Sequence, residues 1–311
     1  MRKIVFLYPG QGSQKVGMGE DLIRNYPPAN DIFREASRIL GFDLKKLCLK
    51  GPEEELTRTK NLQPALLTVS WILTKLLEEK GILPLAVAGH SLGEYSAILA
   101  ARVVDFSTAL KIVTKRAELM EEAGKEKKGG MVAVIGLKED EVLRICEQIG
   151  QVQAVNFNCP GQIVVSGIRE KISSVIDEFK KSGAKKVIPL PVSGAFHSFL
   201  MKTAAEKFSL FLDQFNFGDP IYRVVSNATG EFSLSGEDVK NNLKLHMDHP
   251  VLWEKSMRVL IGKRYNTFIE VGPGKVLQGL VKRIEKKVEV FGVEGFQSVN
   301  ALLGRLKKEN C

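Results

Sequence analysis

The pentapeptide Gly89-His90-Ser91-Leu92-Gly93 constrains the fold of this chain more than any other feature. It follows an apolar run at residues 85–88 and precedes residues 94–101, whose composition predicts a helix. In a G-x-S-x-G turn between a strand and a helix, the glycines allow a tight turn, so the serine hydroxyl stands clear of the sheet. The backbone N–H after the serine lies at a helix N-terminus, where it can stabilise a developing oxyanion.

The alternative is a glycine-rich loop with an incidental serine. The apolar run before the turn and the helix after it favour a nucleophilic serine. The motif therefore predicts acyl chemistry, and it leaves open whether water or another group accepts the acyl group.

Composition is that of a globular protein, with 44% apolar and 26% charged residues. No apolar run reaches the ~18 residues that a membrane span needs. The basic and apolar start at residues 2–8 ends at Pro9, which is too short for a signal peptide with its usual apolar region of ~7–15 residues. We therefore expect a first β-strand there, and a cytoplasmic protein that does not bind membranes.

The cysteines and histidines do not predict a metal site. His246 and His249 could share a helix face, but no cysteine or carboxylate completes a set of ligands. Four cysteines lack metal or disulfide spacing and are expected to be buried or terminal free thiols: Cys48, Cys146, Cys159 and Cys311.

The net charge of +9 comes from basic residues spread along the chain, and aromatic residues make up 7%. Nucleic-acid binding is not expected from this pattern. A basic surface suits an acidic protein partner or a phosphate-bearing ligand, although it is also compatible with a solvated surface that has no specific partner.

The first third of the chain alternates between strand and helix patterns, which predicts a parallel sheet with helices on both faces. Strands are expected at residues 3–8 and 85–88, and helices at 18–25, 28–40, 53–57, 64–79 and 107–124.

The pattern changes after a charged, glycine-ended break at residues 125–130. Strands are expected at 131–135, 152–156, 163–166 and 185–190, and helices at 138–149 and 170–181. This β-α-β-β-α-β order is ferredoxin-like. We expect a small subdomain at residues 128–191, inserted into a larger one made of residues 1–127 and 192–311.

Ser91 needs a general base, and the candidate is His197, which follows the inserted segment. A histidine near a domain boundary is more often structural, but the serine turn and the scarcity of other histidines favour a catalytic role. The side chain of His90 should point elsewhere. No acid is identifiable as the partner of His197, and a backbone carbonyl can hold an imidazole tautomer equally well.

Two further features bear on the site. The turn at residues 9–14 contains Gly10 and Gly12, so its N–H groups could supply an oxyanion donor, or it could be an ordinary strand-to-helix turn. Arg116 lies on or beside the apolar stripe of the 107–124 helix. Arg116 either forms a structural ion pair or snorkels to the solvent, or it is a planar cation that awaits a substrate carboxylate.

The chain resembles the malonyl-CoA:acyl carrier protein transacylases, acyltransferases of bacterial fatty acid synthesis, over essentially its whole length. Six ordered motifs carry the resemblance: residues 10–14 (GQGSQ), 61–65 (NLQPA), 89–95 (GHSLGEY), 115–120 (KRAELM), 194–198 (GAFHS) and 270–274 (EVGPG).

The resemblance implies an α/β-hydrolase-like large subdomain with a parallel sheet, a ferredoxin-like small one, and an active site between them. It implies that Ser91 is the nucleophile and His197 the base. The site residues that it further implies are the oxyanion-hole N–H groups of Gln11 and Leu92, with Arg116 on the malonyl carboxylate and Gln63 near the substrate. Phe196, next to His197, is expected to narrow the acyl pocket.

The family holds its histidine through the backbone carbonyl of a glutamine, and His246 occupies that position here. Any residue offers a carbonyl, so catalysis should survive, and the role of the glutamine side chain is left open.

The resemblance also implies the reaction. Malonyl would pass from malonyl-CoA to the phosphopantetheine thiol of an acyl carrier protein through a malonyl-serine, with no cofactor and in a monomer. A thioesterase or esterase that uses water, and an inactive module that binds carrier proteins, are the alternatives. The presence of Arg116 argues against the first and the intact Ser91 and His197 against the second.

Overall fold

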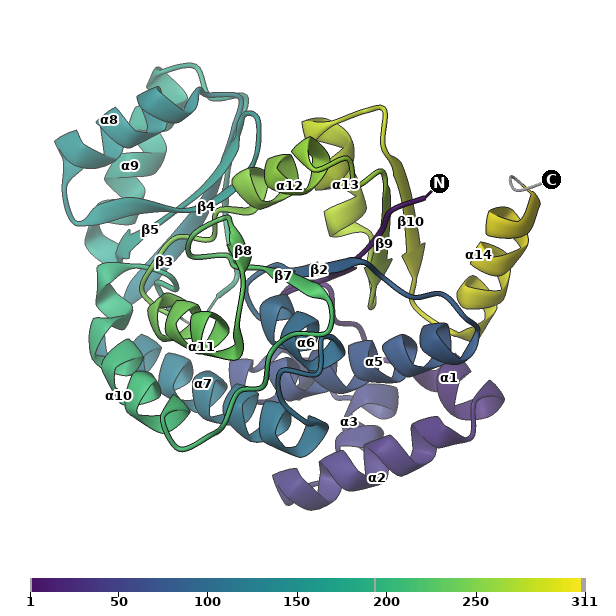
Figure 1. The fold of residues 1–311 in the computed structure, drawn as a ribbon. Coiled ribbons are helices and arrows are strands. Elements are labelled where there is room, and N and C mark those ends of the chain that lie inside the picture. Colours follow the sequence, from purple (N-terminus) through teal and green to yellow (C-terminus); the bar gives the residue numbers. More distant parts are fainter. Residues whose placement is uncertain (1, 193, 309–311) are drawn as a thin grey trace.

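The computed structural model describes residues 2–192 and 194–308. Within them the chain forms one sheet of six strands and one of four. The smaller sheet and its two helices stand at the upper left of Figure 1, and the other helices surround the larger sheet (Figure 1).

The larger sheet has the strand order β10-β9-β1-β2-β7-β8. Its first five strands are parallel, and only β8 runs antiparallel to its neighbour. Central strands of parallel sheets are buried on both faces, which suits the apolar sequences of β1 and β2. The strands are β1 (Ile4–Tyr8), β2 (Ala86–Gly89), β7 (Arg223–Val225), β8 (Phe232–Ser233), β9 (Thr267–Val271) and β10 (Glu289–Val293).

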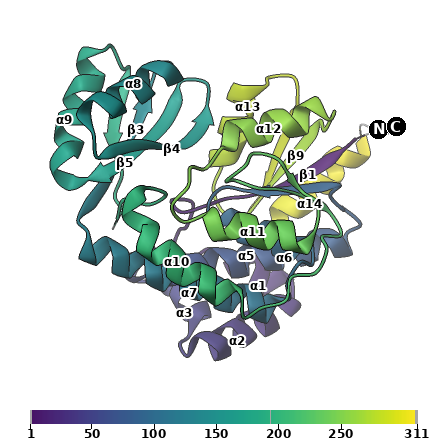
Figure 2. The ribbon, with the colours of Figure 1, turned by 60° about the vertical axis from the view of Figure 1, so that its left-hand side comes forward.

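Helices cover both faces of this sheet. They are needed because successive apolar side chains of β1 point to opposite faces. Phe6 and Tyr8 of β1 pack into the core formed with α5 (Thr59–Glu79), α6 (Gly93–Ala100) and α7 (Phe106–Glu126). Val5 and Leu7 pack with α12 (Trp253–Gly262) and α13 (Val276–Ile284) on the opposite face. The predicted parallel sheet with helices on both faces is confirmed (Figures 1 and 2).

The remaining helices around the larger sheet complete its core and its edge. Helix α14 packs beside the edge strand β10 and contacts α1. Their bounds are α1 (Glu20–Asn25), α2 (Pro28–Leu40), α3 (Leu44–Lys50), α4 (Glu53–Thr57), α10 (Lys202–Leu212), α11 (Gly236–Leu245) and α14 (Phe296–Lys308), with a 3₁₀ turn η1 (Phe199–Met201).

The smaller sheet has the strand order β4-β5-β3-β6, and all of its neighbours are antiparallel. Val132 and Val134 of β3 form a core with its two helices, whereas Met131 and Ala133 face the opposite way, toward the main body. The predicted β-α-β-β-α-β order is therefore present. Its elements are β3 (Gly129–Ile135), α8 (Glu139–Ile149), β4 (Val152–Cys159), β5 (Gln162–Ile168), α9 (Arg169–Lys181) and β6 (Lys186–Pro189).

Backbone hydrogen bonds join the smaller sheet to the main body. The Val251 N–H donates to Val155 O at 2.8 Å, and the Phe157 N–H donates to Val251 O at 3.0 Å. This short parallel bridge adds the segment before α12 to the edge of β4. It ties the edge of the smaller sheet to the main body.

Some predicted boundaries were wrong. The expected break at 125–130 covers only residues 127 and 128, because α7 continues to Glu126 and β3 begins at Gly129. The helix predicted at residues 64–79 begins earlier than expected. Helix α5 starts at Thr59, so Pro64 lies inside it and not at its first position. Helix α3 was missed, although Asp43 caps it by accepting a hydrogen bond from the Lys46 N–H.

The expectation of buried free thiols is met where the structure describes the cysteines. Cys48, Cys146 and Cys159 are buried free thiols, while Cys311 lies outside the described residues. His249 is bonded to Asp248 at the surface. Residues 2–192 and 194–308 contain no cluster of three metal-ligating side chains and no helix that could cross a membrane.

Candidate active site

Ser91 stands at the sharp turn between β2 and α6, with a φ of 50° in the left-handed region. A Cβ on Gly89 would lie 1.9 Å from the backbone carbon of Gly93, and one on Gly93 would lie 2.0 Å from Tyr8 O. Only glycine fits at these two positions. The strand, turn and helix predicted around the serine are all present.

His197 forms the hydrogen bond that the prediction required. Its Nε2 lies 2.7 Å from Ser91 Oγ, and its Nδ1 lies 2.9 Å from the backbone oxygen of His246. Because that carbonyl can only accept, Nδ1 carries the hydrogen and Nε2 is free to accept the serine proton. The ring stands on a residue with a φ of 62°, just before η1.

His197 is only 3% exposed. Burial, followed by the positive charge of Arg116, lowers the pKa of His197 to about 3. A histidine with so low a pKa is uncharged at neutral pH, which is the state that a general base needs.

Arg116 reaches the same site from α7, whose first turn is capped by the Asp105 side chain. The arginine is 1% exposed. Its Nη2 donates to Ser91 Oγ at 3.0 Å and its Nη1 donates to Gln63 Oε1 at 2.8 Å. Its guanidinium carbon lies 5.2 Å from the centre of the Tyr95 ring.

The guanidinium of Arg116 has no anionic partner among residues 2–192 and 194–308, where no carboxylate oxygen lies within 4.0 Å of it. Its buried Nε makes no hydrogen bond either. Burial lowers the pKa of Arg116, since desolvation disfavours its charged form. A buried cation in this state has room in its hydrogen-bonding fork for an anion, and its substrate-binding role stays a prediction.

A cavity of about 260 Å³ lies in front of these groups, between the two sheets. Its lining residues include Ser91, Arg116, Gln63 and His197, which the sequence had singled out. Phe196 and Leu92 also line it. The opposite wall comes from the smaller sheet: Met131, Ala133, Asn156, Asn158, Gln162 and Val164.

The N–H groups of Gln11 and Leu92 both belong to residues that line this cavity. Gly10 packs so tightly on the serine turn that a Cβ there would lie 2.5 Å from His90 O. Within the described part of the chain, neither N–H donates a hydrogen bond to the protein. Both are therefore free to meet a ligand, and their oxyanion role stays a prediction.

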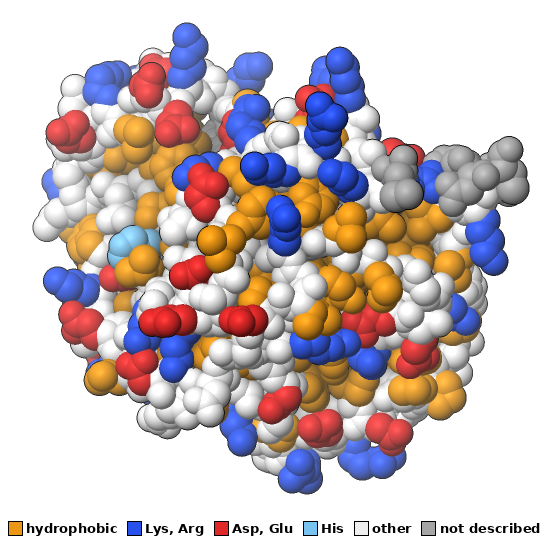
Figure 3. Space-filling view, in the orientation of Figure 1, with side chains coloured by type: hydrophobic (Ala, Val, Ile, Leu, Met, Phe, Trp, Pro, Cys, Tyr) orange, Lys and Arg blue, Asp and Glu red, His pale blue; other side chains and the backbone are white. Residues whose placement is uncertain are grey.

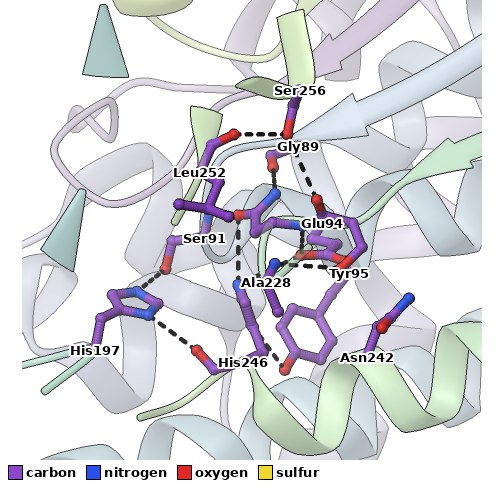
Figure 4. A network of polar contacts seen from close by, with 12 residues as sticks. Gly89, Ser91, Glu94, Tyr95, His197, Ala228, Asn242, His246, Leu252 and Ser256 are labelled. Carbon is purple, nitrogen blue, oxygen red and sulfur yellow. Dashed lines mark hydrogen bonds and ion pairs between the residues drawn. The ribbon is translucent and has the colours of Figure 1, made fainter. Parts of the chain in front are cut away.

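His90 follows the expectation that its side chain turns away from the Ser91 hydroxyl. Its Nε2 lies 2.7 Å from Asn158 Oδ1, and its ring packs on Trp253. His246 offers its carbonyl as expected, and its own imidazole is buried beside His197, with 5.3 Å between the two ring centroids (Figure 4).

Sequence reasoning missed Asn227, which follows β7. Its side chain forms hydrogen bonds with the backbone on both sides of His90: with the Gly89 carbonyl and with the Ser91 N–H. The available signal was weak: an asparagine just after a short apolar strand, at the carboxyl edge of a parallel sheet, where sites of such folds form.

Comparison with known proteins agrees with this geometry. Residues 5–310 match the family model described as an acyl transferase domain. The chain belongs to the acyl transferase family. A malonyl CoA-acyl carrier protein transacylase of Bacillus subtilis is 42% identical over 314 residues, covering 100% of this chain and 99% of that protein. A protein of the same name from Staphylococcus aureus (strain MSSA476) is 42% identical over 303 residues, covering 96% and 98%.

Solved structures also match the whole fold. An acyl carrier protein S-malonyltransferase from Vibrio cholerae has a TM-score of 0.93 at 38% identity, covering 96% of this chain and 99% of that one. PlMCAT, a malonyl-transacylase solved in complex with the type II polyketide acyl-carrier protein AntF, has a TM-score of 0.95 at 39% identity, covering 97% and 99%. The mixed α/β fold with a parallel sheet is thus shared with these enzymes.

Proposed function

We propose that this chain is an acyl-carrier-protein S-malonyltransferase. It moves malonyl from malonyl-CoA to the phosphopantetheine thiol of an acyl carrier protein and so supplies malonyl groups for fatty acid synthesis. The observation that carries the proposal is the buried guanidinium of Arg116, unpaired with any described carboxylate and 3.0 Å from Ser91 Oγ. A carboxylate on the acyl group is the anion that fits there.

The first half-reaction loads the enzyme. His197 Nε2 takes the Ser91 hydroxyl proton as Oγ attacks the thioester carbonyl and forms a C–O bond. The tetrahedral oxyanion accepts hydrogen bonds from the N–H groups of Gln11 and Leu92. Collapse breaks the C–S bond, and the imidazolium returns its proton to the sulfur of the departing CoA.

The second half-reaction unloads the enzyme onto the carrier protein. The phosphopantetheine thiol gives its proton to His197 and attacks the malonyl-serine ester. A new C–S bond forms, the C–O bond to Ser91 breaks, and the proton returns to Oγ. CoA leaves before the carrier thiol reacts, so the kinetics are ping-pong.

Every step uses side chains and amides of the chain together with its two substrates, so the proposed reaction calls for no resident cofactor. A hydrolase that uses water would need no buried cation facing the acyl group, and Arg116 is the residue that favours the transferase.

The charge of the enzyme supports an acidic carrier protein as the partner. The chain has a net charge of +9, and Lys and Arg side chains gather over α12 and α13 in the space-filling view (Figure 3). Opposite charges speed the encounter of two proteins. The monomeric state and the cytoplasmic location stay predictions.

We also propose the subdomain roles. Residues 1–127 and 192–311 would be an α/β-hydrolase-like catalytic part, which supplies the nucleophile, base and arginine. Residues 128–191 would be a ferredoxin-like part that supplies the opposite wall. The element order of the smaller sheet and its separate core support this division.

Incubation with radiolabelled malonyl-CoA, followed by mass spectrometry of peptides, tests the function. We expect a malonyl adduct on the Ser91 peptide, its disappearance when acyl carrier protein is added, and no adduct on Ser91→Ala. Label on Ser13 or Cys159, or rapid release of free malonate without a carrier protein, would contradict the proposal.

A further inference from the structure

The side-chain amide of Asn227 holds the serine turn from both sides. Its Oδ1 accepts a hydrogen bond from the Ser91 N–H at 2.7 Å, and its Nδ2 donates to Gly89 O at 2.6 Å. The Asn227 N–H donates to the buried carboxyl of Glu94 at 3.1 Å. Asn227, which lies just after β7, therefore fixes the backbone that presents the nucleophile.

His246 contacts the other site residues both through its backbone carbonyl and through its imidazole. Its carbonyl accepts from His197 Nδ1, while its ring Nε2 lies 3.4 Å from Asn227 Oδ1 and 3.4 Å from Glu94 Oε2. The other ring nitrogen, Nδ1, lies 3.3 Å from the Tyr95 hydroxyl. A neutral ring satisfies all of these contacts when Nε2–H donates to the two oxygens and Nδ1 accepts from the tyrosine.

These contacts close a ring of hydrogen bonds that begins and ends at one residue. The ring runs from Ser91 Oγ to the His197 imidazole and on to the His246 carbonyl. It continues from the His246 imidazole to Asn227 Oδ1 and back to the Ser91 N–H. The members come from four separate segments of the chain.

We propose that Asn227 and the imidazole of His246 are positioning residues for the Ser91–His197 pair, whose alignment this closed ring sets. The inference rests on the proposed function only in taking Ser91 as the nucleophile. It assigns a task to the His246 side chain, where the carbonyl alone had been expected to matter.

The backbone conformation at Ser91 and His197 shows why this closed ring of hydrogen bonds is needed. Ser91 and His197 both have φ in the left-handed region, at 50° and 62°. Residues other than glycine adopt that conformation at a cost, and it persists only where surrounding contacts hold it in place. The nucleophile and the base lie 106 residues apart in sequence, so nothing local keeps their side chains in register.

The test compares Asn227→Ala, His246→Leu and His246→Gln in the full-length enzyme. Glutamine has a side-chain N–H that can replace imidazole Nε2–H, whereas leucine has none. The control is Thr74→Val, which lies outside this closed set of hydrogen bonds. It removes a buried hydroxyl that is hydrogen-bonded to the Tyr8 hydroxyl and to Ser70 O. Two assays are used: malonyl transfer, with kcat and KM separated, and the burst of p-nitrophenol from p-nitrophenyl acetate, a neutral ester that reports Ser91 reactivity.

We expect Asn227→Ala to lower kcat and the ester burst rate by about 10²-fold, and His246→Leu by about 10-fold, because misplaced reacting atoms slow the chemistry. The KM for malonyl-CoA should not change, and His246→Gln should keep most of the activity. Thr74→Val should lower the melting temperature without changing either rate.

Wild-type rates in folded Asn227→Ala or His246→Leu would overturn the proposal, as would a His246→Gln burst as slow as that of His246→Leu. If Asn227→Ala does not fold, the two His246 variants decide alone. An ester burst slowed in these variants, in an enzyme that does not transfer malonyl, would support the positioning role and refute the proposed function instead.

Discussion

Arg116 Nη2 lies 3.0 Å from Ser91 Oγ, so one guanidinium contacts the proposed nucleophile and also lines the cavity in front of it. The second arm of its fork is held by Gln63. A carboxylate bound to this arginine would be placed at a fixed distance from the attacking oxygen. In the proposed reaction, the same side chain would both recognise the acyl group and align it for attack.

Arg116→Ala should reduce selectivity as well as rate. Malonyl loses a buried, charge-assisted partner worth roughly 2–4 kcal/mol, whereas acetyl has no carboxylate to lose. The ratio of kcat/KM for malonyl-CoA over acetyl-CoA should fall by about 10²-fold or more, at 1.4 kcal/mol per factor of ten. Arg102→Ala, which removes an arginine paired with Glu78 elsewhere, is the control. An unchanged ratio in Arg116→Ala would mean that this arginine is structural.

The pH profile should lack the usual histidine limb. Because the pKa of His197 is lowered to about 3, the base stays deprotonated until the pH falls far below 6.5. We expect kcat/KM for malonyl-CoA to be flat from about pH 8 down to about pH 5, since this parameter reports the free enzyme. His197→Ala should lower the rate by several orders of magnitude. An acid limb near pH 6.5 in the wild type would show that the base is less buried than the structure indicates.

Glu94 should make the protein less stable as the pH rises. Burial raises the pKa of Glu94 from 4.5 to about 8. Between these values the folded state binds more protons than the unfolded state, so the free energy of unfolding decreases with rising pH. The loss is a few kcal/mol at most, at about 1.4 kcal/mol per pKa unit.

Glu94→Gln should remove this dependence, as measured by urea unfolding at several pH values between 4.5 and 8. Glu121→Gln is a control of opposite sign, measured below pH 4.5: the pKa of Glu121 is lowered, so its stabilisation disappears as the pH falls below that value. A Glu94→Gln protein with the same slope as the wild type would contradict the prediction.

Phe196 should limit the size of the acyl group. It lines the cavity next to His197, so a methyl branch on the malonyl carbon would compete with its ring for space. Excluding one methyl group is worth only ~1–3 kcal/mol, so wild-type discrimination between malonyl and methylmalonyl should be real but incomplete. Competition between the two CoA thioesters should show weaker discrimination in Phe196→Ser. Phe199→Ser, at a partly exposed position outside the cavity lining, should leave it unchanged.

The sequence predicted the parts of the site that are local. The serine turn is encoded within five residues, because only glycine fits at Gly89 and Gly93. Arg116 stood out because a cation on an apolar helix stripe must be buried. The β-α-β-β-α-β segment was predictable because its strands are separated by short turns and amphipathic helices.

The parts that were missed depend on contacts between distant segments. Asn227 lies 136 residues from the Ser91 that it holds, and its short strand β7 has no pattern of its own. The ring of His246 acquires its partners only when α6, β7 and the end of α11 meet. Such contacts follow from the packing of the sheet and leave no periodicity in the sequence.

The bridge between Val251 and β4 uses backbone atoms alone, so it places no demand on side chains. A donor segment could replace residues 128–191 if its edge strand offers the same carbonyl and N–H and its inner face replaces the contacts of Met131, Ala133 and Asn158 with the main body. Substrate range could then be altered by exchanging one wall of the cavity as a unit, while the nucleophile, the base and the arginine stay untouched.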